Sequence, residues 1–335
     1  MLRRVNSTRR VAFVCVSHPH AAGRLLAAKS IEECEVAGLW DPDPGCAKST
    51  AEQFGVPLFE DFSEAIRPDV DLVIIDGTNA QCSEFATLCA REGKAILVEK
   101  PGAESPARLE ELAQTVHETG VFCQVGYHLR YSPSVRWALE QHHSGRIGRV
   151  TTGRFHAAVM SPWLTNEWFT DTRDRGGMVY LDFCHMLDLL MLFLGDLSAQ
   201  KSVISALAGM PPHPFEDSAA MILQFGDVLL AGDVCGWEAN DWITTWNIEL
   251  YGTNGTLDVG IHPPIASLLV RDWDTGAEST HKHSTANFDG NLNYRYELED
   301  ALVSIESGKP RHGCSMDSAL RVARAIEDMY RENGL

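Results

Sequence analysis

The sequence predicts an α/β protein whose N-terminal part is a doubly wound parallel sheet. Short apolar runs alternate with helix-like segments over about the first 125 residues. One run, 70–77 (VDLVIIDG), lacks the polar alternation of a half-exposed strand and is typical of a parallel strand buried on both faces. At 335 residues the chain exceeds one ordinary core, so we expect two domains or one large domain with an insertion.

The expected elements of this sheet follow one another along the chain. The predicted strands are 10–16, 34–41, 57–60, 70–77, 94–99 and 121–126. The predicted helices are 21–30, 45–55, 62–66, 82–93 and 105–120. Because parallel strands are joined by right-handed crossovers, these segments form successive βαβ units of a single sheet.

Composition and charge narrow the class of protein. Hydrophobic residues make up 44% of the chain and charged residues 22%, as in an ordinary soluble globular protein. Forty-six acidic residues against 28 basic ones give a formal net charge of −18, which repels nucleic-acid phosphates and anionic membranes. We therefore expect neither nucleic acid nor a membrane as a partner.

The N-terminus and the cysteines point to a cytoplasmic protein. The basic segment MLRRVNSTRR is followed by an apolar stretch that SHPH (17–20) interrupts at once, which indicates a solvated tail rather than a targeting signal. The nine cysteines include no Cys-x-x-Cys pair, so neither a disulfide framework nor a zinc site is favoured. We expect no metal.

The turn after the first strand is where a dinucleotide-binding sheet meets the pyrophosphate. A full fingerprint reads G-x-G-x-x-G, whereas residues 15–20 read CVSHPH. Ser17 is small enough to let a ligand approach the backbone. Helix N-terminal amides and the imidazoles of His18 and His20 could bind a pyrophosphate in place of the glycine turn.

Asp41 ends the second predicted strand. An acid at this position can accept both hydroxyls of an adenosine ribose and repels a 2′-phosphate, which favours NAD over NADP. The same residue opens DPDPG, which also has the composition of a simple turn with Asp at its first position. The sequence leaves both interpretations open.

Lys100 follows an apolar strand directly, within Glu99-Lys100-Pro101, at the edge of the sheet where ligands bind. Pro101 fixes the chain direction, and Lys100-Pro101 is a candidate for a cis peptide bond. A partly desolvated lysine beside a cationic nicotinamide has a lowered pKa, which suits it to donate or relay a proton. The alternative is a solvated ion pair of Glu99 with Lys100.

Segment 175–195 predicts a buried helix. From Met178 to Leu194 every residue is apolar or aromatic except Asp182, His185 and Asp188. These three argue against membrane insertion, and their spacing places them on one stripe. Burying them is costly unless each is paired. A histidine that titrates near neutral pH favours an acid/base role for His185, and a structurally satisfied polar stripe is the alternative.

Several motifs together resemble the Gfo/Idh/MocA family, which includes glucose-fructose oxidoreductase and inositol 2-dehydrogenase. They are the degenerate first turn, DGTNAQC (76–82), GKAILVEKP (93–101), GYHLRYSP (126–133), GGMVYLDFCHMLD (176–188) and ELYGTNGTLDV (249–259). The resemblance covers essentially the whole chain. Its most specific element is Glu99-Lys100-Pro101 after a parallel strand, supported by the spacing to His185.

The resemblance implies a Rossmann domain that binds NAD, and hydride transfer between nicotinamide and a secondary alcohol or hemiacetal carbon of a sugar, cyclitol or related polyol. It implies that Lys100 contacts the substrate and tunes the proton relay. It also implies that His185 is the acid/base. Thr78, Asn79 and Glu99 are then expected to help hold the cofactor.

Three features depart from the family pattern. The glycines of the first turn are missing, and the family's TPxxxH loop reads TNAQC at 78–82, without the proline and the histidine. The family has an acid four residues before the histidine, where this chain has Leu181. Asp182 lies one residue further along and is the candidate to orient His185, provided that the helix is rotated or begins differently.

The resemblance also implies three parts of the chain: the Rossmann domain at 1–126, a second α+β domain on an open, mostly antiparallel sheet at 127–292, and C-terminal helices at 293–335 that pack back on the first domain. The expected strands of the second sheet are 149–159, 218–226, 228–237, 244–252 and 255–260, and the expected closing helices are 296–307 and 315–333. One face of the sheet has few charges and is expected to form a homodimer or homotetramer.

Aromatic and basic residues suit a carbohydrate-like substrate. Tyr127 and Trp163 offer faces for a sugar ring, although core packing explains them almost as well, and His128 and Arg130 could engage a hydroxyl or carboxylate. Two other functions stay open: an NAD-using sugar hydrolase or lyase of the same fold, and a non-catalytic dinucleotide-binding regulator.

Overall fold

The computed structural model describes residues 8–158, 174, 176–206, 216–236, 245–285 and 290–335. They form two compact units: the described residues of 1–128 and 289–320, and those of 129–288 and 321–335. The division falls within the last helix, α9 (Met316–Glu332). The predicted assignment of 1–126, 127–292 and 293–335 to separate domains stays a prediction.

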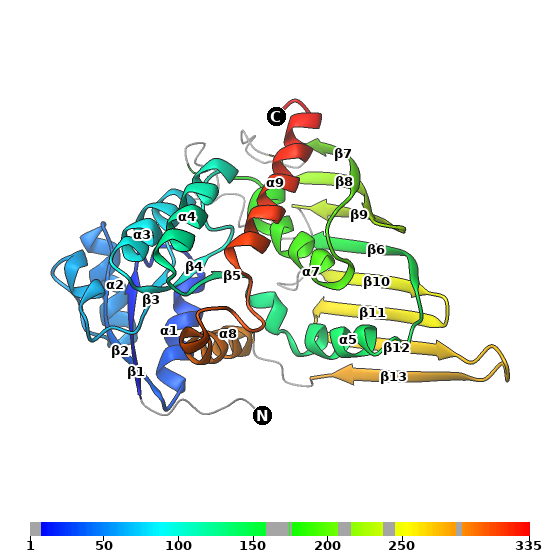
Figure 1. The fold of residues 1–335 in the computed structure, drawn as a ribbon, viewed down its shortest axis with the longest axis horizontal. Coiled ribbons are helices and arrows are strands. Elements are labelled where there is room, and N and C mark those ends of the chain that lie inside the picture. Colours follow the sequence, from blue (N-terminus) through cyan, green and yellow to red (C-terminus); the bar gives the residue numbers. More distant parts are fainter. Residues whose placement is uncertain (1–7, 159–173, 175, 207–215, 237–244, 286–289) are drawn as a thin grey trace. The chain divides into compact units, whose positions relative to one another are not determined.

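The first unit is built on a parallel sheet of five strands in the order β2-β1-β3-β4-β5 (Figure 1). The strands are β1 (Arg9–Val14), β2 (Cys34–Trp40), β3 (Leu72–Ile75), β4 (Ala95–Glu99) and β5 (Cys123–Gly126). β1 pairs with β2 on one side and β3 on the other, so the chain reverses its direction across the sheet at β1. This confirms the predicted doubly wound sheet.

Helices cover both faces of this sheet. They are α1 (His20–Ser30), α2 (Pro44–Phe54), α3 (Asn79–Arg91), α4 (Pro106–Thr119) and α8 (Asn291–Ser304). α1 packs against α8 and α3 against α4 (Figure 1). Leu298 of α8 shares one apolar core with Phe13 of β1 and Leu25 of α1, so a late segment completes the N-terminal fold.

Two short elements of the first unit differ from the prediction. The expected strand 57–60 is reduced to one parallel bridge between Leu58 and Leu39, because Pro57 has no N–H to extend the ladder. The expected helix 62–66 is a 3₁₀ turn, η1 (Phe62–Ile66), and the chain is extended at Arg67. Pro68 explains this end, since a residue before proline disfavours the helical conformation.

The second unit contains a sheet of eight strands in the order β13-β12-β11-β10-β6-β9-β8-β7. The strands are β6 (Val150–Ala158), β7 (Ala199–Ser205), β8 (Ser218–Phe225), β9 (Val228–Cys235), β10 (Trp246–Gly252), β11 (Gly255–His262), β12 (Ile265–Arg271) and β13 (Glu278–Ser284). Only β6 and β9 pair in parallel, which confirms the mostly antiparallel sheet. The sequence analysis missed β7, β12 and β13.

The helical segments of the second unit include η2 (His128–Tyr131), which begins at the unit boundary, α5 (Pro133–His143), η5 (Val179–Phe183) and α7 (Cys184–Leu194). α5 covers β11 and β12. It was not predicted, although a proline at the first helical position marks its start. The predicted buried helix 175–195 is divided into a π-helical turn, η5, and α7.

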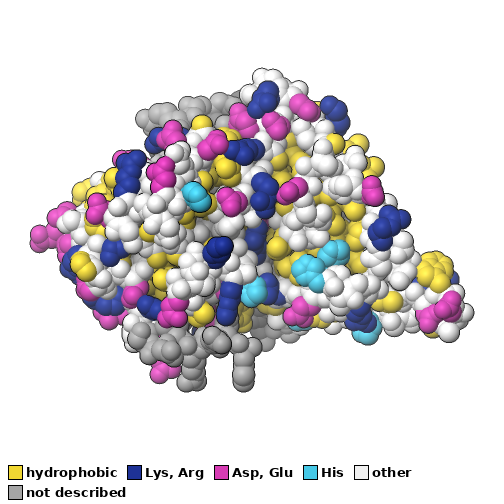
Figure 2. Space-filling model, in the orientation of Figure 1, with side chains coloured by type: hydrophobic (Ala, Val, Ile, Leu, Met, Phe, Trp, Pro, Cys, Tyr) yellow, Lys and Arg dark blue, Asp and Glu magenta, His cyan; other side chains and the backbone are white. Residues whose placement is uncertain are grey.

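None of the nine cysteines, all of which the structure describes, forms a disulfide bond. Among the residues that the structure describes, no helix is both long and apolar enough to cross a membrane. The basic tail predicted at the N-terminus falls largely on residues 1–7, outside the described part. Acidic and basic side chains are interspersed over the face drawn in Figure 2.

Candidate functional site

Asp41 at the end of β2 fastens the turn that follows β1. The Val16 N–H donates to Asp41 Oδ2 at 2.7 Å, and the Asp43 N–H donates to Oδ1 at 2.8 Å. Burial raises the pKa of the Asp41 carboxyl, and these two backbone donors oppose that effect. An ionised carboxylate has about four acceptor positions, so both oxygens can still accept ribose hydroxyls. The donor set therefore fits a dinucleotide.

The turn expected at DPDPG is present at its first acid, because Asp41 Oδ1 accepts from the N–H of Asp43, two residues further on. Asp43 accepts hydrogen bonds from the amides of Gly45, at 2.8 Å, and Cys46, at 3.3 Å, and so caps α2. Asp41 and Asp43 thus have separate tasks.

The first turn keeps the backbone path of a glycine turn without its glycines. Cys15, at the first glycine position, has φ 56, in the left-handed region where glycine is preferred. Gly77, which follows β3, lies close to Cys15. A Cβ on Gly77 would be 2.6 Å from Cys15 Cβ, so the two backbones can approach this closely only because residue 77 is a glycine. Ser17 is exposed and His18 is buried.

Beneath this turn lies a set of buried charges that the sequence analysis missed, here called the Arg24 cluster: Arg24, Asp76, Glu99 and Glu297. Arg24 Nε donates to Glu297 Oε2 at 2.9 Å, and Nη1 donates to Glu99 Oε2 at 2.6 Å and also to Asp76. One guanidinium therefore serves three carboxylates. Burial raises the pKa of Asp76 to about 6 and that of Glu297 to about 7.

Lys100 lies against the other side of Glu99, with Nζ 3.8 Å from Glu99 Oε1. The side chains are 4% and 1% exposed, so the solvated ion pair is wrong and the pair is buried. Burial alone would raise the pKa of Glu99, but the neighbouring imidazole and cations hold it below its ordinary value. The Lys100-Pro101 peptide bond is cis, as the sequence suggested.

Histidines complete this edge of the first unit. His20 Nδ1 lies 2.9 Å and His18 Nε2 lies 3.7 Å from Glu99 Oε1. His128, predicted from sequence as a substrate residue, lies in ring contact with His20, at 4.8 Å between centroids, and its substrate role stays a prediction. Tyr294 of α8 stacks near both rings and was not anticipated. Five predicted site residues, Ser17, His18, His20, Glu99 and Lys100, thus lie around one turn and strand end.

The loop after β3 has a structural explanation. The Thr78 hydroxyl accepts from the Gln81 N–H at 3.3 Å, and Gln81 Oε1 accepts from the Thr78 N–H at 3.0 Å. This is a capping box, and it satisfies two amides at the start of α3. Asn79, the first residue of α3, is 3% exposed. The T-x-x-Q pattern was the signal for this cap.

In the second unit, His185 is buried in the first turn of α7, with its ring centroid 6.3 Å from that of Trp246. Asp182 lies in η5 and is only half-buried. Asp188 accepts two hydrogen bonds from Arg130, Nε at 2.7 Å and Nη2 at 2.5 Å. The predicted polar stripe is therefore, at Asp188, a structural ion pair.

Glu216 and Tyr330 hold the start of the helical segment that carries His185. Glu216 Oε1 accepts from the Val179 N–H at 2.9 Å and from the Tyr330 hydroxyl at 2.5 Å. Gly177 has φ 102, and a Cβ there would lie 2.2 Å from Glu216 Oε2. Only glycine therefore fits below this carboxylate, which explains the second glycine of GGMVYLD.

The remaining predicted residues divide between the units. Tyr127 is 1% exposed in the first unit, where a packing role is sufficient to explain it. Arg130 already binds a carboxylate of its own chain, so its substrate role stays a prediction. Trp163 lies outside the described residues.

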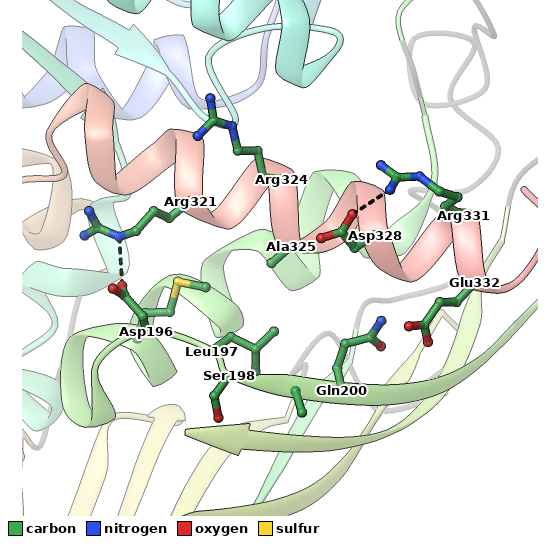
Figure 3. Close-up of a pocket in the computed structure, with 12 residues that line it drawn as sticks. Asp196, Leu197, Ser198, Gln200, Arg321, Arg324, Ala325, Asp328, Arg331 and Glu332 are labelled. Atoms are coloured by element: carbon green, nitrogen blue, oxygen red, sulfur yellow. Dashed lines mark ion pairs between the residues drawn. The ribbon is translucent and has the colours of Figure 1, made fainter. Parts of the chain in front are cut away.

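A hollow of about 500 Å³ lies in the second unit between α9 and the turn from α7 into β7 (Figure 3). In its lining Arg321 of α9 pairs with Asp196 at 2.9 Å, and Arg331 pairs with Asp328 of the same helix at 3.2 Å. Three arginines, Arg321, Arg324 and Arg331, face three acids, Asp196, Asp328 and Glu332. This balance of charge gives no preference for an anion or a cation. Among the predicted site residues that the structure describes, none lines the hollow.

The comparisons with known proteins agree with this geometry. The family described as "Oxidoreductase family, NAD-binding Rossmann fold" matches residues 6–127, and the "GFO/IDH/MocA C-terminal domain" matches residues 135–258. The fold and the first-unit site therefore define an NAD-dependent oxidoreductase. The chain belongs to the GFO/IDH/MocA family, as its motifs suggested.

Individual relatives cover most of the chain. It is 31% identical over 255 residues to 1,5-anhydro-D-fructose reductase of Ensifer adhaerens, covering 73% of this chain and 71% of that protein. It is 27% identical over 331 residues to scyllo-inositol 2-dehydrogenase (NAD(+)) of Bacillus subtilis (strain 168), covering 91% and 89%. Levoglucosan dehydrogenase in complex with NADH and L-sorbose has the same fold, with a TM-score of 0.87, 18% identity and coverage of 98% and 97%.

Proposed function

We propose that this protein moves a hydride between NAD(H) and a secondary alcohol or hemiacetal carbon of a sugar, cyclitol or related polyol. Relatives named as an anhydrofructose reductase and an inositol dehydrogenase support this substrate class. NAD supplies the hydride acceptor, and Asp41 is the proposed partner of its ribose hydroxyls. Ser17, Thr78 and Asn79 are further proposed cofactor contacts.

The observation that carries the proposal is the buried pair of Glu99, the last residue of β4, and Lys100, which follows it. Ligands of doubly wound sheets bind outside the carboxyl ends of the strands, which is where this lysine lies. Lys100 and His185 are the proposed residues that donate or accept the substrate proton, and Asp182 is the proposed orienter of His185. Tyr127, His128 and Arg130 stay proposed substrate contacts.

The first test is calorimetric titration with NAD, NADH, NADP and NADPH, followed by a screen of polyols and sugars for a change in nicotinamide absorbance. We expect binding of the unphosphorylated pair and turnover of at least one polyol. Lys100→Ala is expected to lower turnover about 100-fold, as for loss of a positioned acid/base group. The control is Lys48→Ala, since the Lys48 side chain is 70% exposed on α2.

Other outcomes identify the alternatives. Product release without net change in nicotinamide absorbance indicates a hydrolase or lyase that uses NAD transiently. A regulator is indicated if the protein binds NAD but turns over no substrate, and if the Lys100→Ala variant keeps the biological activity of the wild-type protein. Unchanged turnover in Lys100→Ala contradicts the assignment of that residue.

We also infer a cytoplasmic homodimer or homotetramer that associates through the outward face of the second sheet. Nine cysteines without a disulfide bond suit a reducing compartment. Val203 on β7, Ile222 on β8 and Leu229 on β9 are 68%, 51% and 52% exposed on neighbouring strands. Such an apolar face supports association. Sedimentation velocity is expected to show an oligomer that Ile222→Glu weakens, whereas a monomeric wild-type protein contradicts the inference.

A further inference from the structure

The third glycine position of the first turn is occupied by His20. In the pattern G-x-G-x-x-G the glycines correspond to Cys15, Ser17 and His20, and the positive φ of Cys15 supports this register. The third glycine normally permits close packing of helix and strand. Here an imidazole stands at that place, and its Nδ1 lies 2.9 Å from the buried carboxylate of Glu99 on β4.

His18 uses the backbone groups that such a turn normally offers to a pyrophosphate. The His20 N–H donates to His18 Nδ1 at 3.0 Å, and the Ala21 N–H donates to the His18 carbonyl at 3.0 Å. These are the first two amides of α1, and helix N-terminal amides are the usual anion donors. These two amides are therefore not available to a pyrophosphate in this arrangement.

The same hydrogen bond fixes the protonation of His18. Because the His20 N–H points at Nδ1, this nitrogen is an acceptor and the ring proton is on Nε2, which faces Glu99 at 3.7 Å. A metal ion bound to His18 Nε2 would require the ring proton to be on Nδ1. That proton would then meet the His20 N–H, which already donates to Nδ1. Although His18, His20 and Glu99 offer ligand atoms within 4.8 Å of one another, His18 Nε2 carries the ring proton in this arrangement and is not available as a metal ligand.

His20 is the imidazole that can change its charge. Its side chain is 21% exposed against 5% for His18, and its ring contacts those of His18 and His128 edge-on, at 4.4 and 4.8 Å. Burial, then Lys100 and Arg24, lowers the pKa of His20 well below its ordinary value, so the ring is neutral at neutral pH. Other charged and titratable groups surround the His20 ring and Glu99. They are His18 in the turn before α1, Arg24 in α1, Asp76 after β3, Lys100 after β4, His128 in η2, and Tyr294 and Glu297 in α8.

We propose that His20 takes up a proton from solvent when the dinucleotide binds, and that the resulting imidazolium replaces the engaged amides as the partner of the pyrophosphate. The proposal rests on NAD binding as set out above. The proton goes to Nε2, and Nδ1 stays 2.9 Å from Glu99 Oε1, so the imidazolium lies between an anion of the protein and an anion of the ligand. No bond other than this N–H forms or breaks.

The proposal predicts a direction for the pH dependence of binding. An opposite charge close to a titratable group shifts its pKa by about 1–3 pH units toward the charged form. The gain in affinity is complete below the pKa of free His20 and is lost as the pH rises through the higher pKa of the complex. NADH binding is therefore expected to weaken about twofold or more between pH 6 and pH 8.

The test is calorimetric titration of the full chain with NADH at pH 6 in MES and in bis-Tris, whose ionisation enthalpies differ. The difference in heat gives the number of protons bound, expected to be about 0.5 or more per NADH. His20→Asn is expected to bind NADH more weakly with uptake close to zero. His117→Asn is the control, because His117 is exposed on α4 of the same unit, and it should behave as wild type.

The outcomes separate this proposal from the function on which it depends. NADH binding without proton uptake by the wild-type protein overturns the role of His20 and leaves NAD-dependent hydride transfer intact. Uptake that survives in His20→Asn assigns the proton to another group and also overturns it. Absence of binding by any dinucleotide overturns both proposals. The wild-type comparison of buffers needs no variant, so a variant that fails to fold does not affect it.

Discussion

One guanidinium in the first unit faces three buried carboxylates, whereas in the second unit the buried guanidinium of Arg130 faces one. The Arg24 cluster therefore has an excess of acid, and burial raises the pKa values of two of its members toward neutrality. The Arg130–Asp188 pair is balanced and bidentate. An unbalanced cluster beside a ligand edge can respond to added charge, while a balanced pair mainly holds two segments together.

The largest expected effect is that of Arg24→Met. The substitution leaves Asp76, Glu99 and Glu297 buried without their common partner, and removing one partner of a buried pair costs about 3–5 kcal/mol. We expect a loss of at least this size in urea unfolding. Arg91→Met on the exposed side of α3 is the control and should change stability by less than about 0.5 kcal/mol. A loss below about 1 kcal/mol in Arg24→Met contradicts the importance of the cluster.

The second prediction concerns the balanced pair. Arg130→Met alone leaves the Asp188 carboxylate buried and should cost about 3 kcal/mol. Because a buried ion pair can be replaced by apolar residues of similar volume at little cost, Arg130→Met with Asp188→Leu should recover to within about 1 kcal/mol of wild type. Failure of this double variant to recover, measured by urea unfolding, would mean that the pair is as interconnected as the Arg24 cluster.

The third prediction uses the excess of acid directly. Burial raises the pKa of Glu297 from 4.5 to about 7 in the folded protein. The folded protein thus keeps a proton that the unfolded chain has lost, so the contribution of this group to stability falls as the pH rises from about 4.5 to 7. The decrease in the free energy of unfolding with rising pH should be smaller in Glu297→Gln, by on the order of 1–3 kcal/mol, because the amide does not titrate.

The check is the free energy of unfolding at pH 5 and at pH 7.5 for wild type and Glu297→Gln. The exposed Glu118→Gln on α4 serves as the control. Equal pH dependence in wild type and Glu297→Gln contradicts a proton held by Glu297.

The smallest expected effect is that of Tyr330→Phe in the second unit. It removes the hydroxyl that donates to Glu216 and leaves the ring in place. A single neutral-to-charged hydrogen bond contributes about 1–3 kcal/mol, and the Val179 N–H still donates to the same carboxylate, so we expect about 1 kcal/mol. Faster amide exchange at the start of η5 should accompany this loss, and unchanged exchange there would show that Glu216 holds the segment without Tyr330.

The sequence was most informative where local pattern and tertiary structure agree. The apolar run ending in Glu99-Lys100-Pro101 predicted a buried strand, a ligand-edge lysine and a candidate cis bond, and the structure has β4, a buried lysine and a cis peptide there. It was least informative at β13, whose residues are exposed almost throughout and show no alternation. Such an edge strand is fixed by pairing with β12, which one sequence does not reveal.

The sequence alone determined the order of strands and helices in the first unit, because burial on both faces and the 3.6-residue helical repeat leave a local mark on residue type. It also marked the acid at the end of β2 and the lysine after β4. Only the tertiary structure decided what these groups meet. The Arg24 cluster joins α1, β3, β4 and α8 across as many as 273 residues of chain, and no local pattern encodes such a distance. The one available sign was a lone arginine in the apolar helix AAGRLLAA.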